Sequence, residues 1–540
     1  MMEIKVLLHH IILNFKIVKT KKTLDPIKLQ PHVFNIRALN GTWMISEAIV
    51  SLLSFLLFYV IYEYKKIHYN FKKHGIKYKP GYPIFGNTFN STFLFKHLIE
   101  DIDAVYTAFP EERYVGFIEG MKPVILVRDP ELMKTITIRD FHYFVNRKEM
   151  FPKEIEPLLG SSLLNMEGDD WRKMRNRLSS AFSGSKMKSM MPFMVEVSKN
   201  IIEYIKGHQS EDIDVLDLMR RYNTDVVAST GFGLHVNSIR DRDNKFFTIG
   251  QRAATFTFWR RMYYFITIQF PAVAKIMQFL GIELLSSEGT EFFRNIVSDT
   301  IAYRKTNNVV RPDFIHLLME AAQDLTLDEI TGQIYFAFLA SYESSTSTLM
   351  MCIHELALRP DIAEKIYQEI RTKQENFGEL NYECIIELKY MECVLNEAAR
   401  KWSVAVVMDR VCTENYILPP PREDGKPYWV QPGDVVYNVV NSIHMDQAFH
   451  PSPETFDPDR FCDENKHNVN SFTHMPFGMG PRNCLGMRYA MLKMKVLLYH
   501  LILNYKIVRC KKTSDPLRLQ PLDFSVRAIG NTYVQFQRRP

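Results

Sequence analysis

A single cysteine in a glycine-rich loop has the setting best suited to metal chemistry. Cys484 lies between Gly480 and Gly486, and an apolar helical pattern follows from Met487 to about Asn504. The thiol therefore stands where a helix begins. Unpaired backbone NH groups and the positive end of the helix dipole favour a thiolate at such a place. A thiolate there is suited to bind a soft or redox-active metal. The alternative is an inert, buried cysteine beside a turn.

A second reactive group stands in the middle of a long predicted helix. Thr326 opens a capping box and Pro360 closes the helix, which predicts about 32 residues and a length near 48 Å at roughly 1.5 Å per residue. Its centre holds Ser341, Glu343 and Ser344, followed by further hydroxyls. An acid and a run of hydroxyls have poor helix propensity and a desolvation cost, so something must compensate them. Alternatively, the serines bond their own backbone and merely bend the helix.

The cysteine loop resembles the haem-binding signature of the cytochrome P450 family. Phe477, Gly480, Arg482, Cys484 and Gly486 match Phe-x-x-Gly-x-Arg-x-Cys-x-Gly, which a chain of this length reaches by chance about once in several thousand sequences. In this family a cysteine thiolate ligates haem iron and favours cleavage of the dioxygen bond. The resemblance implies haem b as cofactor, Cys484 as axial ligand and Arg482 as partner of a propionate. It places Phe477 among the cofactor-binding residues, and it implies that Gly486 lets the next helix run close under the porphyrin.

Further matches imply further haem contacts. Trp171 and Arg175 lie four apart on one face of a basic helix and are similar to the family's Trp-x-x-x-Arg motif, whose donors bind a propionate. A surface Trp/Arg pair is the plainer alternative. Arg410 is similar to another propionate-binding arginine of the family.

The hydroxyl-rich helix resembles the family's oxygen-activation motif. By that resemblance Glu343 and Ser344 are the catalytic acid and alcohol that relay protons from water. Two departures stand out: Ser341 replaces a usual Gly, and Ser344 replaces a usual Thr.

A structural cluster is implied near the cysteine. Glu397 and Arg400, three apart on a helix, and Arg460, in a downstream Phe-Asp-Pro-Asp-Arg-Phe segment, resemble the family's buried Glu-Arg-Arg cluster. Exposed pairs of this kind contribute only a few tenths of a kcal/mol. In the family, the helix of Trp171 with its sequel and the helix after Cys484 lie on the cysteine side of the haem, so the resemblance implies a basic surface there for an acidic electron donor. A solvated charged face is the alternative. Its residues are Arg172, Lys173, Arg177, Lys186, Lys188, Arg488, Lys493 and Lys495.

Composition is that of a globular enzyme. With 46% apolar and 24% charged residues, 540 residues can bury a large core, and no Gly/Ser- or Pro-rich linker divides the chain after about residue 90. Seven cysteines without a C-x-x-C pair indicate a reducing compartment. A net charge of +6 does not call for nucleic acid, and no dinucleotide-binding fingerprint is present.

The N-terminal region divides into three parts. Residues 5–39 align without gaps on residues 495–529 with about two thirds identity, so residues 1–43 are predicted to be an anomalous duplicate from a gene fusion or faulty gene model, with Met44 as the authentic start. Residues 45–62 are predicted to be a transmembrane anchor; a cleaved signal peptide is the alternative. The following lysines place the rest of the chain in the cytosol, on the endoplasmic reticulum membrane. Residues 63–90 resemble the basic, proline-rich hinge of the cytochrome P450 family; an ordinary loop is the alternative.

Together these matches predict a mainly α fold with small β-sheets: one cytochrome P450-type domain over residues 91–540 behind a membrane anchor helix. The spelling around Arg410 and Cys484 is most similar to insect detoxification members of the family-nine or family-six type. The implied activity is monooxygenation of a lipophilic substrate with electrons from an NADPH-dependent flavoprotein reductase, with cytochrome b5 as a further partner. An aromatic stretch between Phe246 and Phe279 is predicted as a partly membrane-dipping lid; core packing explains it equally. Two other functions stay open: a peroxide-rearranging enzyme of the same fold, and a haem-binding membrane protein that has lost catalysis.

Overall fold

The computed structural model describes residues 43–540 except 256, 322–324 and 522–525. It divides into two units, Met1–Asn70 and Phe71–Pro540. Helix α2, Trp43–Lys73, contains the predicted anchor and the start of the predicted hinge. Within the described part of the chain, no helix is both long enough and apolar enough for a bilayer crossing. The predicted duplicate at residues 1–43 lies outside the described residues, except for its last one.

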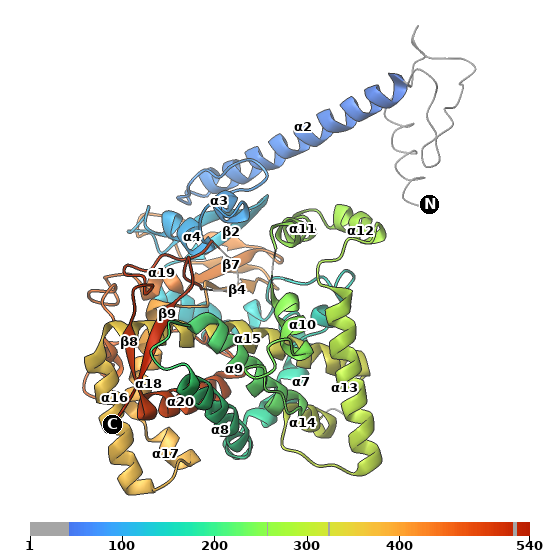
Figure 1. Cartoon of the computed structure of the whole chain (residues 1–540). Helices are drawn as coiled ribbons and strands as arrows, with labels where there is room; N and C mark the ends of the chain where they lie inside the picture. The colour runs from blue at the N-terminus through green and yellow to red at the C-terminus, as the bar shows by residue number, and fades with distance from the viewer. Residues whose placement is uncertain (1–42, 256, 322–324, 522–525) are drawn as a thin grey trace. The chain divides into compact units, whose positions relative to one another are not determined.

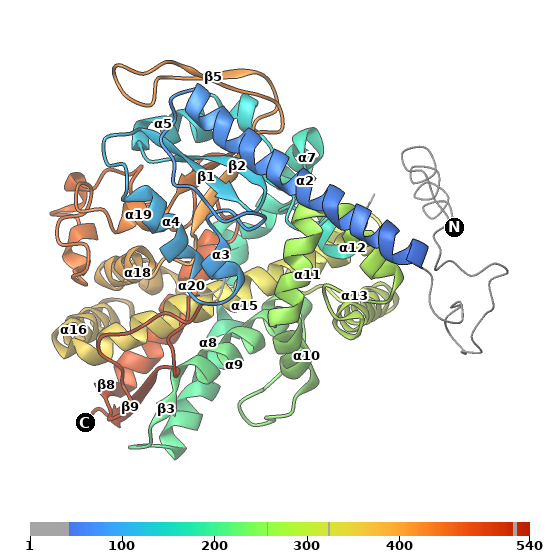
Figure 2. The same cartoon turned by 90° about the horizontal axis from the view of Figure 1, so that it is seen from above.

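The long helix α15, Leu327–Leu358, runs across the middle of the second unit (Figures 1 and 2). The Thr326 side chain accepts a hydrogen bond from the backbone NH of Glu329, whose carboxylate accepts one from the Thr326 backbone NH at 2.9 Å. The capping box and Pro360 thus set the predicted bounds. Helices α9 (Val215–Val227), α18 (Lys389–Lys401) and α20 (Met487–Asn504) pack against α15. The core therefore lies around this helix.

Three small sheets complete the second unit. The largest has the strand order β1-β2-β7-β4, in which only β2 and β7 are parallel. Arg410 lies on β4 opposite Val436 of β7. The other sheets have the orders β3-β9-β8 and β5-β6. The strands are β1 Tyr114–Glu119, β2 Lys122–Val127, β3 Ile213–Asp214, β4 Val407–Val411, β5 Tyr416–Leu418, β6 Tyr428–Val430, β7 Val435–Val439, β8 Tyr505–Arg509 and β9 Tyr533–Arg538.

The remaining elements are mostly helical, as the sequence predicts. The other α-helices are α3 Phe89–Thr92, α4 Leu98–Tyr106, α5 Pro130–Lys134, α6 Pro157–Gly160, α7 Gly168–Ser179, α8 Gly184–Gly207, α10 Lys245–Ala254, α11 Phe258–Gln269, α12 Pro271–Phe279, α13 Ser287–Asn307, α14 Phe314–Ala321, α16 Pro360–Phe377, α17 Tyr382–Ile386 and α19 Asn441–His444. Short 3-10 or π turns are η1 Thr135–Arg139, η2 Phe141–Phe144, η3 Ser180–Phe182, η4 Ala228–Phe232, η5 Pro458–Phe461 and η6 Lys466–Asn468.

Candidate active site

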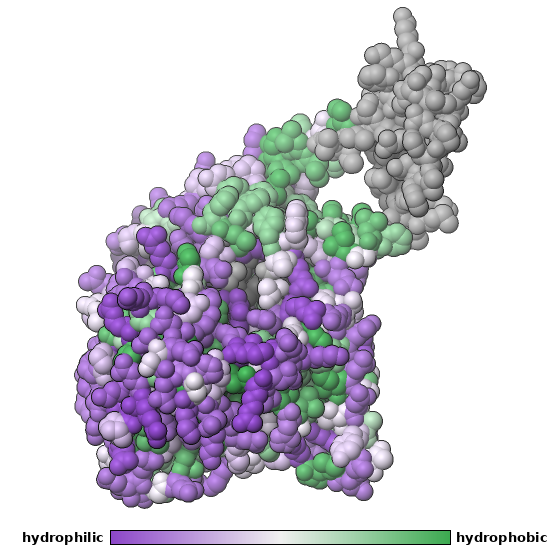
Figure 3. Space-filling model, in the orientation of Figure 1, coloured by the Kyte–Doolittle hydropathy of each residue, from purple (hydrophilic) through white to green (hydrophobic). Residues whose placement is uncertain are grey.

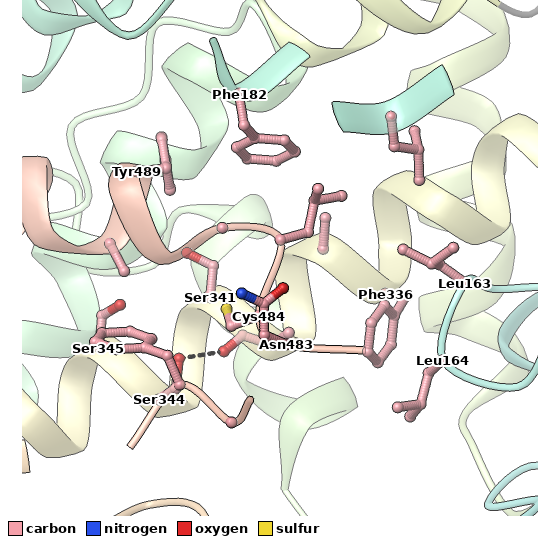
Figure 4. Close-up of a pocket in the computed structure, with 18 of the residues that line it drawn as sticks. Leu163, Leu164, Phe182, Phe336, Ser341, Ser344, Ser345, Asn483, Cys484 and Tyr489 are labelled. Atoms are coloured by element: carbon pink, nitrogen blue, oxygen red, sulfur yellow. Dashed lines mark hydrogen bonds between the residues drawn. The ribbon is translucent and has the colours of Figure 1, made fainter. Parts of the chain in front are cut away.

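A cavity of about 460 Å³ lies between α15 and the loop that carries Cys484 (Figure 4). Much of its wall is apolar, from segments far apart in the chain. These side chains include Leu163, Leu164, Phe182, Val227, Ile334, Phe336, Val404 and Met408. Cys484 lines this cavity. Its side chain is accessible because it faces the cavity, although the cavity lies deep in the protein. A lipophilic molecule and a flat cofactor are the ligands that such a wall suits.

The Cys484 loop is held by backbone hydrogen bonds and by glycines in the left-handed region. The Cys484 NH donates to the Phe477 carbonyl at 2.8 Å, and Gly480 has φ +70°. A Cβ at Gly480 would lie 2.1 Å from the Thr137 carbonyl oxygen, so only glycine fits there. A Cβ at Gly486 would meet no protein atom closer than 3.9 Å. Because Gly486 lines the cavity, its missing side chain leaves room on the cavity side rather than against the protein.

The structure modifies the expectation of a preformed thiolate. Burial raises the pKa of Cys484, against the Gly486 backbone NH and the charges of Arg175, Arg147 and Lys493, which lower it. The start of α20 therefore does not by itself produce a thiolate. A bound metal cation would supply the missing stabilisation, because coordination deprotonates a thiol.

The predicted haem-contacting residues of α7 and the cysteine loop come together at this cavity. Trp171, Arg175, Phe477 and Arg482 all line it. Arg175 donates to the Asn483 carbonyl at 2.9 Å and to its side-chain Oδ1 at 2.7 Å. The Arg482 guanidinium stacks on the Trp171 ring, 4.1 Å from its centroid. In this arrangement α7 braces the cysteine loop directly.

Arg482 also binds backbone that the sequence gave no reason to expect. It donates to the carbonyls of Val145 at 2.9 Å and Met166 at 2.7 Å. Arg410 is fully buried but is not among the described residues that line the cavity. Its Nη1 donates to the Asp409 carbonyl at 2.7 Å, while Nε and Nη2 have no partner among the described residues.

The proton-relay residues predicted on α15 are not equally placed. Ser344 lines the cavity, but its hydroxyl donates to the Ala340 carbonyl at 2.6 Å. Glu343 is not among the described lining residues; its carboxylate forms an ion pair with Arg527 and lies 3.8 Å from Arg220. The alcohol thus reaches the cavity, whereas the acid is bound by arginines beside it.

The Glu-Arg-Arg cluster is assembled beside the cysteine loop. Glu397 and Arg400 are fully buried, with Nε and Nη2 of Arg400 at 2.7 and 2.8 Å from the two carboxylate oxygens. Arg460 Nε lies 3.6 Å from Glu397. Arg400 also donates to the carbonyls of His444 and Pro453, each at 2.7 Å. The three residues therefore join α18 to the segments that lead into the cysteine loop.

Comparison with known proteins shows which family has a site of this kind. The cytochrome P450 family model matches residues 77–535. The chain belongs to the cytochrome P450 family. Probable cytochrome P450 9f2 of Drosophila melanogaster is 35% identical over 496 residues, covering 87% of this chain and 95% of that protein. Cytochrome P450 9e2 of Blattella germanica is 33% identical over 509 residues, 87% of this chain and 94% of that protein. Cytochrome P450 6a8 of Drosophila melanogaster is 31% identical over 515 residues, covering 92% of this chain and 99% of that protein.

These findings confirm the predicted family, its insect family-nine and family-six affinity, and the predicted activity class. This P450 is a monooxygenase, and the family's cofactor is haem b. The single mainly helical catalytic domain is likewise confirmed. The anchor, the substrate and the electron donor stay predictions.

The charges around the cavity fit haem b. Burial, with Arg147 and Arg410 nearby, lowers the pKa of Arg482 to about 9, and burial, with Arg147 nearby, lowers that of Arg410 to about 9. Asp409, 3.7 Å from Arg147, and Glu167 are carboxylates whose charges oppose this lowering at Arg482. An excess of guanidinium charge, with two unpartnered donors on Arg410, calls for anionic ligands. The two propionates of haem b would satisfy it.

The sequence interpretation missed one lining residue and misplaced two lysines. Arg147 lines the cavity and donates to the Arg482 carbonyl at 3.0 Å, but a lone arginine in an unremarkable basic run gave no signal. Lys493 and Lys495, predicted to be part of the basic surface, are buried at 0% and 4% exposure. That part of the prediction is wrong, because α20 is enclosed by α8, α15 and α16. Arg172, Lys173, Lys188 and Arg488 are exposed, so a smaller basic surface remains.

Proposed function

We propose that this P450 inserts one atom of dioxygen into a lipophilic substrate, xenobiotic or endogenous, using electrons from an NADPH-dependent flavoprotein reductase. The observation that carries the proposal is the Cys484 sulfur, which opens onto a largely apolar cavity beneath α15. Haem bound at Cys484 would supply the dioxygen chemistry. The apolar wall would bind the substrate and exclude water, and Ser344 on α15 would be the alcohol at the reacting end.

Proton delivery is assigned to Glu343 with Ser344. Glu343 is one residue from the cavity wall, and a carboxylate there can pass protons only if it exchanges Arg527 for water. Arg482, Arg175, Trp171 and Arg410 would orient the cofactor through its propionates. Glu397, Arg400 and Arg460 would hold the cysteine loop and take no part in the chemistry.

A reduced carbon monoxide difference spectrum tests the ligand assignment. The full-length protein should give the thiolate-type Soret band, and Cys484→Ala should abolish it. NADPH-dependent product formation with purified reductase then separates the activities. A peroxide-rearranging enzyme would turn over a peroxide without NADPH, and a protein that has lost catalysis would bind haem yet consume no NADPH with any apolar ligand.

We further propose attachment to the endoplasmic reticulum membrane through residues 45–62, with the catalytic domain in the cytosol and cytochrome b5 as an additional partner. Exposed apolar side chains on α11 and α12, among them Trp259 at 78% and Phe279 at 89%, support a second membrane contact (Figure 3). Residues 1–43 are proposed to be absent from the native protein. Peptide mapping tests this: abundant native peptides from that segment contradict it.

A further inference from the structure

A buried lysine bonds to the one serine of α15 that stands where the family usually has glycine. Lys493 on α20 is fully buried. Its Nζ donates to the Ser341 hydroxyl oxygen at 2.6 Å and lies 3.3 Å from the Ser341 carbonyl. The Tyr222 hydroxyl donates to the Lys493 carbonyl at 2.6 Å, which fixes the backbone from which the lysine extends. A charged hydrogen bond thus joins α20, the helix that follows Cys484, to α15.

The lysine is not held there by a structural ion pair. Within the described part of the chain, no carboxylate lies within ion-pair distance of Lys493 Nζ. Its nearest aromatic ring, Tyr489, lies 5.3 Å from Nζ. Burial lowers the pKa of Lys493 to about 7, whereas the charge of Cys484 raises it. A buried cation without an anion is costly, so this lysine requires a compensating role.

The direction of the hydrogen bond decides what Ser341 can do. While Lys493 carries its proton it has donors only, so the Ser341 oxygen then accepts from Lys493. The Ser341 O–H is then directed elsewhere, and the described residues offer it no acceptor. Ser341 lines the cavity with Cys484 (Figure 4). Ser344 differs, because its hydroxyl proton is already given to the Ala340 carbonyl.

We propose that Ser341, oriented by Lys493, is the hydroxyl of α15 that donates a hydrogen bond to a ligand held at the Cys484 end of the cavity. Ser341 would be the residue that touches the ligand, and Lys493 a positioning residue that acts through it. The inference rests on the proposed function, since it assumes haem bound at Cys484. It gives the serine that replaces the family's usual glycine the role of a fixed donor.

The C–O stretching frequency of the ferrous carbon monoxide complex tests the donor. A hydrogen bond to the bound probe lowers this frequency, so Ser341→Ala and Lys493→Met should both shift it to higher wavenumber. Ser341→Thr keeps a hydroxyl and Lys493→Arg keeps a cation, so each should retain the lower frequency. Ser344→Ala tests the rival donor on the same helix, and Ser347→Ala is the matched control, which should leave the frequency unchanged because Ser347 is not among the described residues that line the cavity.

The results test two claims separately: the donor role of Ser341 and the positioning role of Lys493. An unchanged frequency in Ser341→Ala overturns the proposal, as does a shift in Ser344→Ala alone. A shift in Ser341→Ala without one in Lys493→Met overturns the role of Lys493. The Ser341 variants remove or change one side chain at the cavity wall, so they keep the test possible if Lys493→Met fails to fold. Absence of the thiolate-type Soret band from the unmodified protein would instead reject haem ligation by Cys484.

Discussion

Glu397 and Arg400 form an ion pair from which solvent is fully excluded, with two parallel hydrogen bonds of 2.7 and 2.8 Å. They lie one turn apart on α18, and Arg400 also donates to the carbonyls of His444 and Pro453. Every donor group of the guanidinium is therefore directed at an acceptor of the core. A buried pair of this kind is worth little relative to apolar side chains, but breaking it leaves an uncompensated charge.

Glu397→Gln should therefore lower the free energy of unfolding by about 3–5 kcal/mol and reduce haem content, because Arg400 keeps its charge and loses its carboxylate. Urea unfolding and the haem-to-protein ratio measure the two effects. Lys466→Met removes an exposed pair with Asp463 and should change stability by no more than about 1 kcal/mol. Equal losses in the two variants would contradict a structural role for the buried pair.

Arg410→Met should have opposite effects on the two forms of the protein. Without haem, Arg410 is a buried cation with two unpartnered donors, so an apolar side chain of similar length should stabilise the apoprotein. With haem, the same change removes a donor proposed for a propionate and should speed haem loss. Haem transfer to apomyoglobin and apoprotein unfolding measure these effects. Slower or unchanged haem loss would exclude Arg410 from the haem site.

Three histidines, of which His444 and His450 are buried and His474 is half-buried, predict loss of the cysteine site in acid. The backbone NH of Met475 donates to His444 Nε2 at 2.9 Å, and His450 Nε2 donates to the Thr473 carbonyl at 2.9 Å, just before the cysteine loop. Burial lowers the pKa of His450 to about 4 and that of His474 to about 3, and it holds that of His444 well below its ordinary value. The charges of Arg400 and, at His450, Arg460 act in the same direction, while Asp446 opposes them at His450.

The direction of the pH dependence of stability follows from these pKa shifts. Between pH 6.5 and the folded pKa values the unfolded state binds more protons, so stability falls as the pH decreases through that window, by up to about 1.4 kcal/mol per pH unit for each histidine. The thiolate-type Soret band should be lost over the same range. His450→Gln keeps a donor for Thr473 without titrating, so it should make the loss less steep. His467 is exposed, so His467→Gln should leave the steepness of this loss unchanged. Identical acid profiles would contradict the assignment.

Local signals predicted the elements of this site better than its contacts. The bounds of α15 follow from Thr326 and Pro360, and the start of α20 follows from the glycines around Cys484, because caps and breakers act within a few residues. The burial of Lys493 depends instead on how α20 packs against α15, about 150 residues away in the chain. A lysine in a helix is normally solvated, so the sequence favoured the surface.

The partners of the arginines were equally beyond the sequence. Arg482 binds carbonyls of residues 145 and 166, and Glu343 is paired with Arg527 near the C-terminal strand β9. Backbone carbonyls carry no sequence identity, and charges separated by more than a hundred residues pair only once the fold brings them together. The motifs therefore supplied the candidate residues, and the fold determined what each one contacts.

The ion pair of Glu343 with Arg527 should restrain the proposed acid measurably. Both side chains are 12–13% exposed, and Arg220 lies 3.8 Å from the same carboxylate. In a double-mutant cycle of Glu343→Gln and Arg527→Gln, the coupling free energy should be about 1–3 kcal/mol, because a partly buried pair is weakly screened. The exposed pair of Arg294 with Asp328, of which Asp328 lies on the first turn of the same helix, should give less than about 1 kcal/mol.

Product formed per NADPH should fall in Glu343→Gln, which loses the acid, and be retained better in Arg527→Gln, which keeps it. A coupling no larger than that of the exposed pair would show that Arg527 does not restrain Glu343, and equal losses of product would remove the carboxylate from proton delivery.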